Sequence, residues 1–132
     1  MTQIQPATGL LLPADANQPV RHIQVRPDNT RDMAKLIGCQ WIELVHTPIE
    51  NVAMIVNEEG LLGDKRLNML ASTLYPDPIV GDVLLLGLEG SATTALTEYA
   101  LDTLAQVFDI EPGRSALDVA KKRLGGADGG AA

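Results

Sequence analysis

The sequence predicts a single α+β domain with a mainly antiparallel sheet of about five strands and with helices packed on one side. Three observations predict this class. Several short segments are apolar or alternate apolar with polar residues, as strands do, and short polar turns join them. Other segments repeat apolar residues at helical spacing. The chain has 132 residues, which is enough for one hydrophobic core and too few for two.

The first predicted element is a hairpin. Its first strand is the apolar run 9–13, and its second strand is 20–26, where apolar and polar residues alternate. The residues between them, 14–19, are of turn-forming types. Residues 1–7 show no periodicity, so we assign them to a flexible N-terminus.

A short helix follows the hairpin. The stretch Pro27-Asp28-Asn29-Thr30 offers capping side chains for its start, apolar residues then recur at helical spacing as far as Ile37, and Gly38 can end it. The sequence therefore predicts a short helix at this position.

Two further strands are predicted over 41–46 and 52–56. The loop 47–51 between them is long enough to join antiparallel neighbours, and the polar turn 57–60 closes the second strand. We expect these two segments to form the second hairpin of the sheet.

A helix is predicted over 67–75, with Asn68 as its cap and two prolines after its end. The next segment, 79–87, is almost entirely apolar after Asp82. Such a run is typical of a central strand that is covered on both faces.

The C-terminal part of the chain is predicted to be helical. An amphipathic helix spans 97–108, and its apolar stripe is wide for so small a domain, so we expect a homo-oligomer in which this stripe meets a second copy. Another helix begins at 115–118. The glycine-rich tail 125–132 has nothing to bury and is predicted to be disordered, so the single domain spans 8–124.

Composition and charge exclude several classes of function. The chain carries 17 acidic and 10 basic residues, a formal charge of −7, and the middle segment 57–112 carries ten acidic residues against two basic ones. So acidic a chain cannot neutralise many phosphates, which argues against direct nucleic-acid binding. No apolar run reaches the length of a membrane span, and the single cysteine suits a reducing cytoplasm. We expect a cytoplasmic protein.

Six segments follow one another in a characteristic order: Leu11–Asp15, Val20–Val25, Leu36–Gly38 with Ile42–Glu43, Val56–Gly60, Leu67–Asn68 with Ala71, and Ile79–Val83. Their most specific parts are the asparagine-glutamate turn, the Leu-Asn pair and the Gly-Asp strand start. This order resembles an uncharacterised family, domain of unknown function 3846, and the resemblance covers roughly residues 10–87.

The resemblance has one departure and implies a setting. The family often has two glycines before its Ile-Glu strand, where this chain has Gly38-Cys39. Such domains occur in actinobacteria and in their phages and plasmids, so the resemblance implies an accessory gene of a mobile element and a location in the host cytoplasm. It carries over no established activity.

No motif carries a recognised chemistry. The segment 60–65 lacks the glycine spacing and the hydroxyl residue of a phosphate-binding loop. Cys39, His22 and His46 are scattered, whereas zinc ligands usually come in close pairs. We therefore expect no metal and no cofactor.

Two polar residues leave alternatives open. Glu43 lies among apolar neighbours in a predicted strand, so it is either a solvent-facing residue of a one-sided sheet or a carboxylate in a pocket. Asn68 either caps a helix or contacts a ligand. We place a candidate binding site on the acidic side of the domain, formed by Glu43, Asn57, Glu58, Glu59, Asn68 and Asp82.

These observations support two hypotheses of binding. The first is a non-enzymatic accessory protein of a phage or mobile element that modulates a host system by contacting a host protein with a basic surface. The alternative is a protein that binds or sequesters a small anionic, nucleotide-like molecule in a pocket lined by Glu43, Asn57 and Asn68. An enzyme is the third hypothesis. It ranks below the two binding hypotheses because adjacent carboxylates in a turn do not provide the two contrasting environments of acid–base catalysis.

Overall fold

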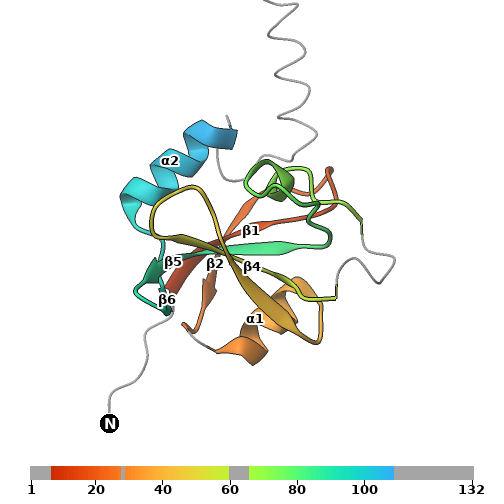
Figure 1. The fold of residues 1–132 in the computed structure, drawn as a ribbon, viewed down its shortest axis with the longest axis horizontal. Coiled ribbons are helices and arrows are strands. Elements are labelled where there is room, and N and C mark those ends of the chain that lie inside the picture. The colour runs from red at the N-terminus through yellow and green to blue at the C-terminus, as the bar shows by residue number, and fades with distance from the viewer. Residues whose placement is uncertain (1–6, 28, 60–65, 109–132) are drawn as a thin grey trace, which may run out of the picture.

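The structure of the chain is a computed structural model, and it describes residues 7–27, 29–59 and 66–108. Figure 1 shows the strands crossing at the centre of the domain, with the two α-helices at its periphery. In chain order the elements are β1 (Ala7–Leu12), β2 (Arg21–Val25), α1 (Thr30–Ile37), β3 (Ile42–His46), β4 (Val52–Asn57), the 3₁₀ helix η2 (Ala71–Thr73), β5 (Val83–Glu89), β6 (Ala92–Thr94) and α2 (Glu98–Phe108).

The strands form one antiparallel sheet in the order β2-β1-β5-β4-β3, and β6 pairs with β5 beside this path. The hairpins β1–β2 and β3–β4 are the two that the sequence predicts. β5 is central, because Leu85 lies opposite Leu10 of β1 on one side and Met54 of β4 on the other. The predicted α+β fold with an antiparallel sheet is confirmed.

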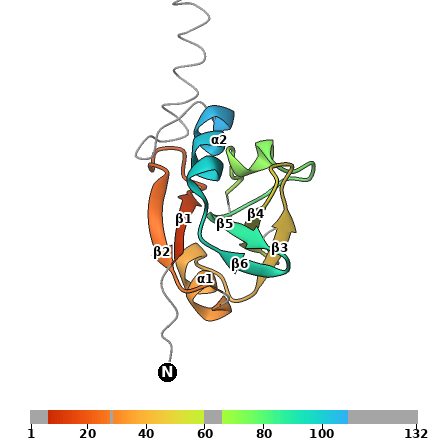
Figure 2. The same cartoon turned by 90° about the vertical axis from the view of Figure 1, so that its left-hand side faces the viewer.

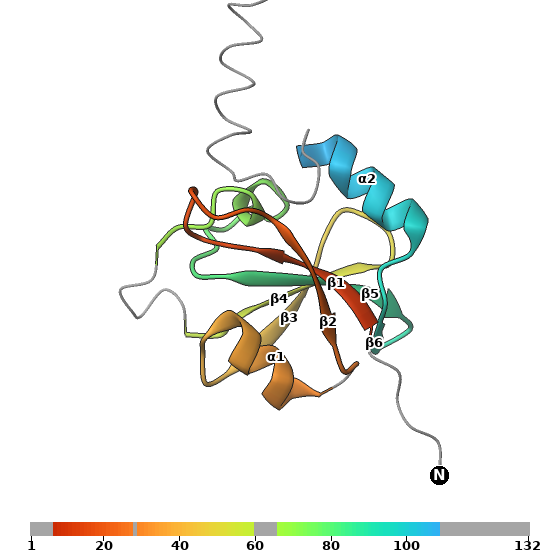
Figure 3. The same ribbon diagram turned by 180° about the vertical axis from the view of Figure 1, so that it is seen from behind.

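The placement of the helices differs from the prediction: they do not share one side of the sheet. Figures 2 and 3 show α1 and α2 on opposite faces. Met33 of α1 belongs to a buried cluster with Leu84, whereas Phe108 of α2 belongs to another with Leu85. Successive residues of a strand face opposite sides, so the apolar run of β5 is buried only if both faces are covered.

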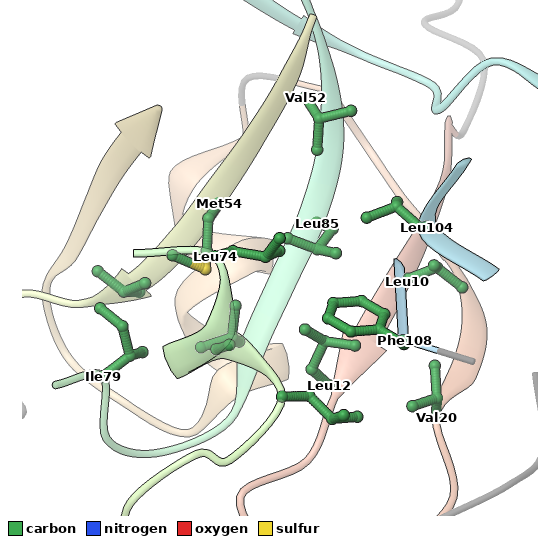
Figure 4. Close-up of a cluster of buried hydrophobic side chains, with 14 of the residues drawn as sticks. Leu10, Leu12, Val20, Val52, Met54, Leu74, Ile79, Leu85, Leu104 and Phe108 are labelled. Carbon is green, nitrogen blue, oxygen red and sulfur yellow. The ribbon is translucent and has the colours of Figure 1, made fainter. Parts of the chain in front are cut away.

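The larger cluster lies between the sheet, η2 and α2. In Figure 4, Leu10 of β1, Met54 of β4 and Leu85 of β5 lie near Leu74, which follows η2, and Phe108 of α2. The rest of the cluster is aliphatic, as the scarcity of aromatic residues in the sequence requires. This core holds the segment after η2 against β3 and β4, where the candidate site lies.

The apolar stripe of α2 is covered by the chain's own core. Leu104 is 0% exposed and Phe108 is 2% exposed, and Leu101 packs against the same cluster. The stripe therefore already has a partner within the chain. Association with a second copy stays a prediction, and it now lacks the support of this stripe.

The predicted helix over 67–75 is much shorter in the structure. Only Ala71–Thr73 is helical, as a 3₁₀ turn. The residues before it pair instead with the segment that precedes β5, through a bridge between Leu67 and Val80 and a hydrogen bond from Asn68 N to Ile79 O at 2.8 Å. This pairing closes a loop over 69–78, which leaves room for one turn of helix.

The predicted ends of α1 are confirmed. Asn29 caps the start, since its side chain accepts a hydrogen bond from Asp32 N, and Gly38 ends the helix in the left-handed region at φ 70°. The Gly38 and Cys39 amides donate to the carbonyls of the last turn, which is a Schellman cap. This cap turns the chain back towards β3.

A β-hairpin stands where the sequence suggests only a connecting loop between β5 and α2. β6 pairs with β5 through a two-residue turn in which Gly90 adopts φ 64°. At Gly87 a Cβ atom would lie 2.3 Å from the carbonyl oxygen of Ala95. Any side chain would clash with this backbone atom, so the position requires glycine.

The predicted termini fall mostly outside the described residues. β1 begins at Ala7, the last residue that we assigned to the N-terminus, and Ala7 is buried. Residues 1–6, the predicted helix from 115 and the predicted tail 125–132 lie outside the described part of the chain. Within that part, no helix has both the length and the apolar character needed to span a membrane.

Candidate functional site

A hollow of about 250 Å³ lies at the edge of the sheet, between β3, the end of β4 and the segment after η2. Its base is apolar and includes Val45, Val56 and Ile79, which are all buried. Its polar residues include three exposed carboxylates, those of Glu43, Glu58 and Asp77. We call this site the acidic hollow; among the described residues its lining also includes Asn57, Tyr75, Pro78 and Val80.

The β3–β4 register places Glu43 in the acidic hollow. Glu43 lies opposite Val56, and on β3 it shares a face with Val45, two residues on. That face leads into the larger core, but at Glu43 the cover ends and the side chain is exposed. The structure therefore combines a feature of each alternative for Glu43. The carboxylate is exposed to solvent, and it also lines a hollow.

The turn after β4 is held by its own polar groups. Asn57 Oδ1 accepts a hydrogen bond from Glu59 N at 3.0 Å, and Glu58 N donates to the carbonyl of Trp41 at 3.0 Å. Asparagine side chains commonly fix turns in this way. The result is that Glu58 has a fixed backbone position at the acidic hollow, while Glu59 is exposed and does not line it.

Asp77 reaches the acidic hollow from a separate segment. It lies between Pro76 and Pro78, whose rings restrict the backbone and exclude a helix at Asp77. Ser72 Oγ accepts a hydrogen bond from Ile79 N at 3.3 Å, which ties the end of this segment back to η2. The carboxylate is therefore presented by a stiff loop.

Asn68 lies outside the acidic hollow and is 0% exposed. Its Nδ2 donates to the carbonyls of Leu12 at 2.8 Å and Gly81 at 3.0 Å, and its Oδ1 accepts from Ala71 N at 3.0 Å. The last bond fixes the turn that leads into η2, but the cap position of η2 is Leu70, so the predicted role of Asn68 as a helix cap is not found. We call Asn68 with these three partners the Asn68 junction; it joins the end of β1, the start of η2 and the approach to β5.

Asp82 is also engaged within the fold. Its Oδ1 accepts a hydrogen bond from Ala14 N at 2.9 Å, which fixes the turn between β1 and β2, and Asp82 does not line the acidic hollow. The structure thus brings together Glu43, Asn57 and Glu58 of the predicted site. It places Glu59, Asn68 and Asp82 elsewhere.

Among the residues that the structure describes, the lining of the acidic hollow includes no lysine or arginine to balance its charge. The two ion pairs found among the described residues, Arg26–Asp32 and Arg66–Asp15, lie elsewhere. In the first pair, the hydrogen bond from Arg26 lowers the pKa of Asp32 below its ordinary value. The three carboxylates of the acidic hollow should therefore attract a positively charged group.

A bare metal ion fits the acidic hollow poorly. Within the described ranges, no three His, Cys, Asp or Glu side chains gather closely enough to hold a metal. Metal sites need several ligands converging within roughly 2–2.6 Å of one ion. Carboxylates spread around an apolar base suit a larger organic cation, whose alkyl part can contact the base.

Sequence reasoning missed Tyr75 and Asp77 as site residues. The sequence contains a signal for Asp77, because an acidic residue between two prolines can belong to neither a helix nor a central strand. Nothing local indicates that this loop lies against β3 and β4. That contact depends on the pairing of residues 66–68 with 79–81.

A family model matches most of the chain. The model, described as a domain of unknown function (DUF3846), matches residues 8–109. This match confirms the resemblance seen in the sequence and extends it through α2. No match was found among curated proteins or among solved structures.

Proposed function

The chain belongs to the domain of unknown function 3846 family, and on that premise we propose that it is a non-enzymatic accessory binding protein. In this proposal, the acidic hollow receives a lysine or arginine side chain from the basic surface of a host protein. The setting, a phage or mobile element acting in the host cytoplasm, is the one that the family resemblance implies. The observation that carries the proposal is the convergence of Glu43, Glu58 and Asp77 from three separate segments on one hollow.

The size of the acidic hollow supports a side chain as its occupant. Pockets for whole small molecules usually measure roughly 300–1,000 Å³, and the acidic hollow, at about 250 Å³, falls below this range. A lysine or arginine can lay its alkyl stem on Val45 and Val56 while its charged end meets the carboxylates. The alternative of a small anionic ligand is disfavoured here, because the three carboxylates would repel it.

The charge of the surrounding chain supports the same partner. The segment 57–112 has ten acidic and two basic residues, and it includes two of the three carboxylates of the acidic hollow. A field of one sign raises the rate of encounter with an oppositely charged surface and falls with ionic strength. We therefore expect salt-sensitive binding to a basic partner.

A binding role accounts for the arrangement better than catalysis. Acid–base catalysis needs two groups whose environments hold their pKa values apart. Glu43, Glu58 and Asp77 are all exposed, so solvent surrounds each of them in a similar way. An arrangement of like environments suits recognition of a charge.

The test compares two variants that lose the same number of negative charges. The hollow variant carries Glu43→Gln, Glu58→Gln and Asp77→Asn. The matched variant carries Glu50→Gln, Glu89→Gln and Asp102→Asn, which are exposed positions outside the acidic hollow. Each protein and the wild type are immobilised and exposed to an actinobacterial host lysate, and the retained proteins are identified by mass spectrometry.

We expect the wild type and the matched variant to retain a protein with a basic surface that moderate salt releases, and the hollow variant to lose it. Circular dichroism checks that all three proteins are folded. Retention of the same proteins by all three would contradict the proposal, and so would the absence of any specifically retained protein.

A further inference from the structure

A second hollow of about 620 Å³ lies on the other face of the sheet, between α1 and the start of β3. One side includes Arg31, Ala34 and Lys35 of α1, and the other includes Gln40 and Trp41. We call it the basic groove. The two sites have no described lining residue in common, so they can be tested separately.

The two cations of the basic groove lie on one face of α1. Arg31 and Lys35 are four residues apart, so their side chains are neighbours on the helix surface, and both are exposed. The acidic residue of this helix, Asp32, is paired with Arg26 at 2.7 Å and does not line the groove. Within the described part of the chain no carboxylate lines the groove, so its described lining has the opposite charge to that of the acidic hollow.

Trp41 supplies an aromatic surface opposite these cations. This residue is 56% exposed, which is unusual for the largest apolar residue type. Its backbone is fixed, because its carbonyl accepts hydrogen bonds from Glu58 N at 3.0 Å and from Cys39 Sγ at 3.3 Å. The left-handed cap at Gly38 returns the chain so that Trp41 lines the same groove as α1.

We propose that the basic groove binds a nucleoside phosphate, with the base stacked on Trp41 and the phosphate held by Arg31 and Lys35. The three features match the parts of such a ligand: a flat apolar surface for the base and two cations for the phosphate. The small side chain of Ala34 lies between the two cations in sequence and leaves space on the helix. The groove volume lies within the range of roughly 300–1,000 Å³ that small-molecule sites occupy.

The chain contains its own probe, because Trp41 is its single tryptophan. The full-length protein is titrated with ATP, with adenosine and with inorganic tripolyphosphate, while tryptophan fluorescence is recorded. We expect saturable quenching by ATP, with an affinity at least about tenfold higher than that of either part alone. Tripolyphosphate binding as tightly as ATP would reduce the site to an anion site and overturn the proposal.

Variants then assign the binding to the basic groove. Arg31→Gln with Lys35→Gln should weaken ATP binding at least about tenfold and reduce its salt dependence, because the phosphate contacts are lost. The control, Arg21→Gln with Arg66→Gln, removes two exposed cations outside the groove and should leave the affinity within about twofold. Trp41→Leu, followed by calorimetry, should also weaken binding. Absence of saturable quenching, or equal weakening by the control pair, would contradict the proposal.

Discussion

The Asn68 junction and the acidic hollow contain similar polar residues, but the fold uses them differently. At the junction, Asn68 is fully buried and both polar atoms of its side chain have partners within the chain. At the hollow, Glu43, Glu58 and Asp77 are exposed, and none of them enters an ion pair found among the described residues. Polar groups whose bonds are completed internally stabilise the fold, whereas groups presented around a hollow remain available to a ligand.

The largest expected effect is on the Asn68 junction. Asn68→Ala leaves the carbonyls of Leu12 and Gly81 and the amide of Ala71 without their partner in a buried place. Each such group costs roughly 1–3 kcal/mol, so the free energy of unfolding should fall by about 3 kcal/mol or more. Urea denaturation measures this loss.

Asn57→Ala is the control for the Asn68 substitution. Asn57 is half-buried, and its Oδ1 accepts a hydrogen bond from Glu59 N in an exposed turn at the edge of the domain. We expect a loss of about 1 kcal/mol. Equal losses for the two substitutions would contradict the claim that the buried Asn68 contributes more to stability than the half-buried Asn57.

Asp82→Ala tests a second polar contact that stabilises the fold, the hydrogen bond that Asp82 accepts from Ala14 N. The substitution removes the partner of Ala14 N, which is partly buried, and should lower the free energy of unfolding by about 1 kcal/mol. The affinity for a basic partner should be unchanged, since Asp82 does not line the acidic hollow. A loss of affinity in the folded variant would return Asp82 to the binding site.

The hollow variant should hardly change stability. Glu43, Glu58 and Asp77 are exposed, so replacing them with amides should change the free energy of unfolding by less than about 0.5 kcal/mol. Any change should be favourable, because neighbouring negative charges repel each other. A large destabilisation, measured by urea denaturation, would show that these carboxylates stabilise the fold instead.

The smallest effect concerns the exposed ion pair between Arg26 and Asp32. The hydrogen bond from Arg26 is the main cause of the lowered pKa of Asp32, against an opposing effect of burial, and the charges of Arg26 and Lys35 also lower it. A lowered carboxyl pKa contributes stability above the unfolded-state pKa, about 3.9, and this is lost as the pH falls through the folded-state value.

Urea denaturation of the wild type and of Asp32→Asn at several pH values checks this expectation. The two proteins should differ slightly at neutral pH and converge in acid. In an Arg26→Gln background, the effect of Asp32→Asn should shrink. A difference that persists unchanged at the lowest pH would show that the carboxylate charge is not its cause.

Much of the fold could be predicted from local sequence signals. Asn29 and Gly38 mark the ends of α1, and the apolar run of β5 indicates a central strand. An apolar run of this kind needs packed elements on both faces of the sheet. The prediction placed the helices on one side and therefore left the other face uncovered. β6 was missed because three residues, Ala92–Thr94, are too few to show a period.

The candidate site was predicted only in part, for a physical reason. Glu43, Asn57 and Glu58 lie on one hairpin, so the pairing of β3 with β4 brings them together. Asn68 binds the carbonyl of Leu12, far away in the sequence, and such non-local contacts leave no local pattern. The same long-range packing brings Asp77 to the hollow.

The most direct test of the account is an NMR titration of the full-length protein with a lysine-rich peptide. Amide shifts are followed in the wild type and in the hollow variant. We expect saturable shifts concentrated at Glu43, Asn57, Glu58 and Asp77, little change at the Asn68 junction, and their loss in the hollow variant. Shifts spread evenly over exposed carboxylates such as Glu50, Glu89 and Asp102, or unchanged in the hollow variant, would contradict the claim that the acidic hollow is the binding site.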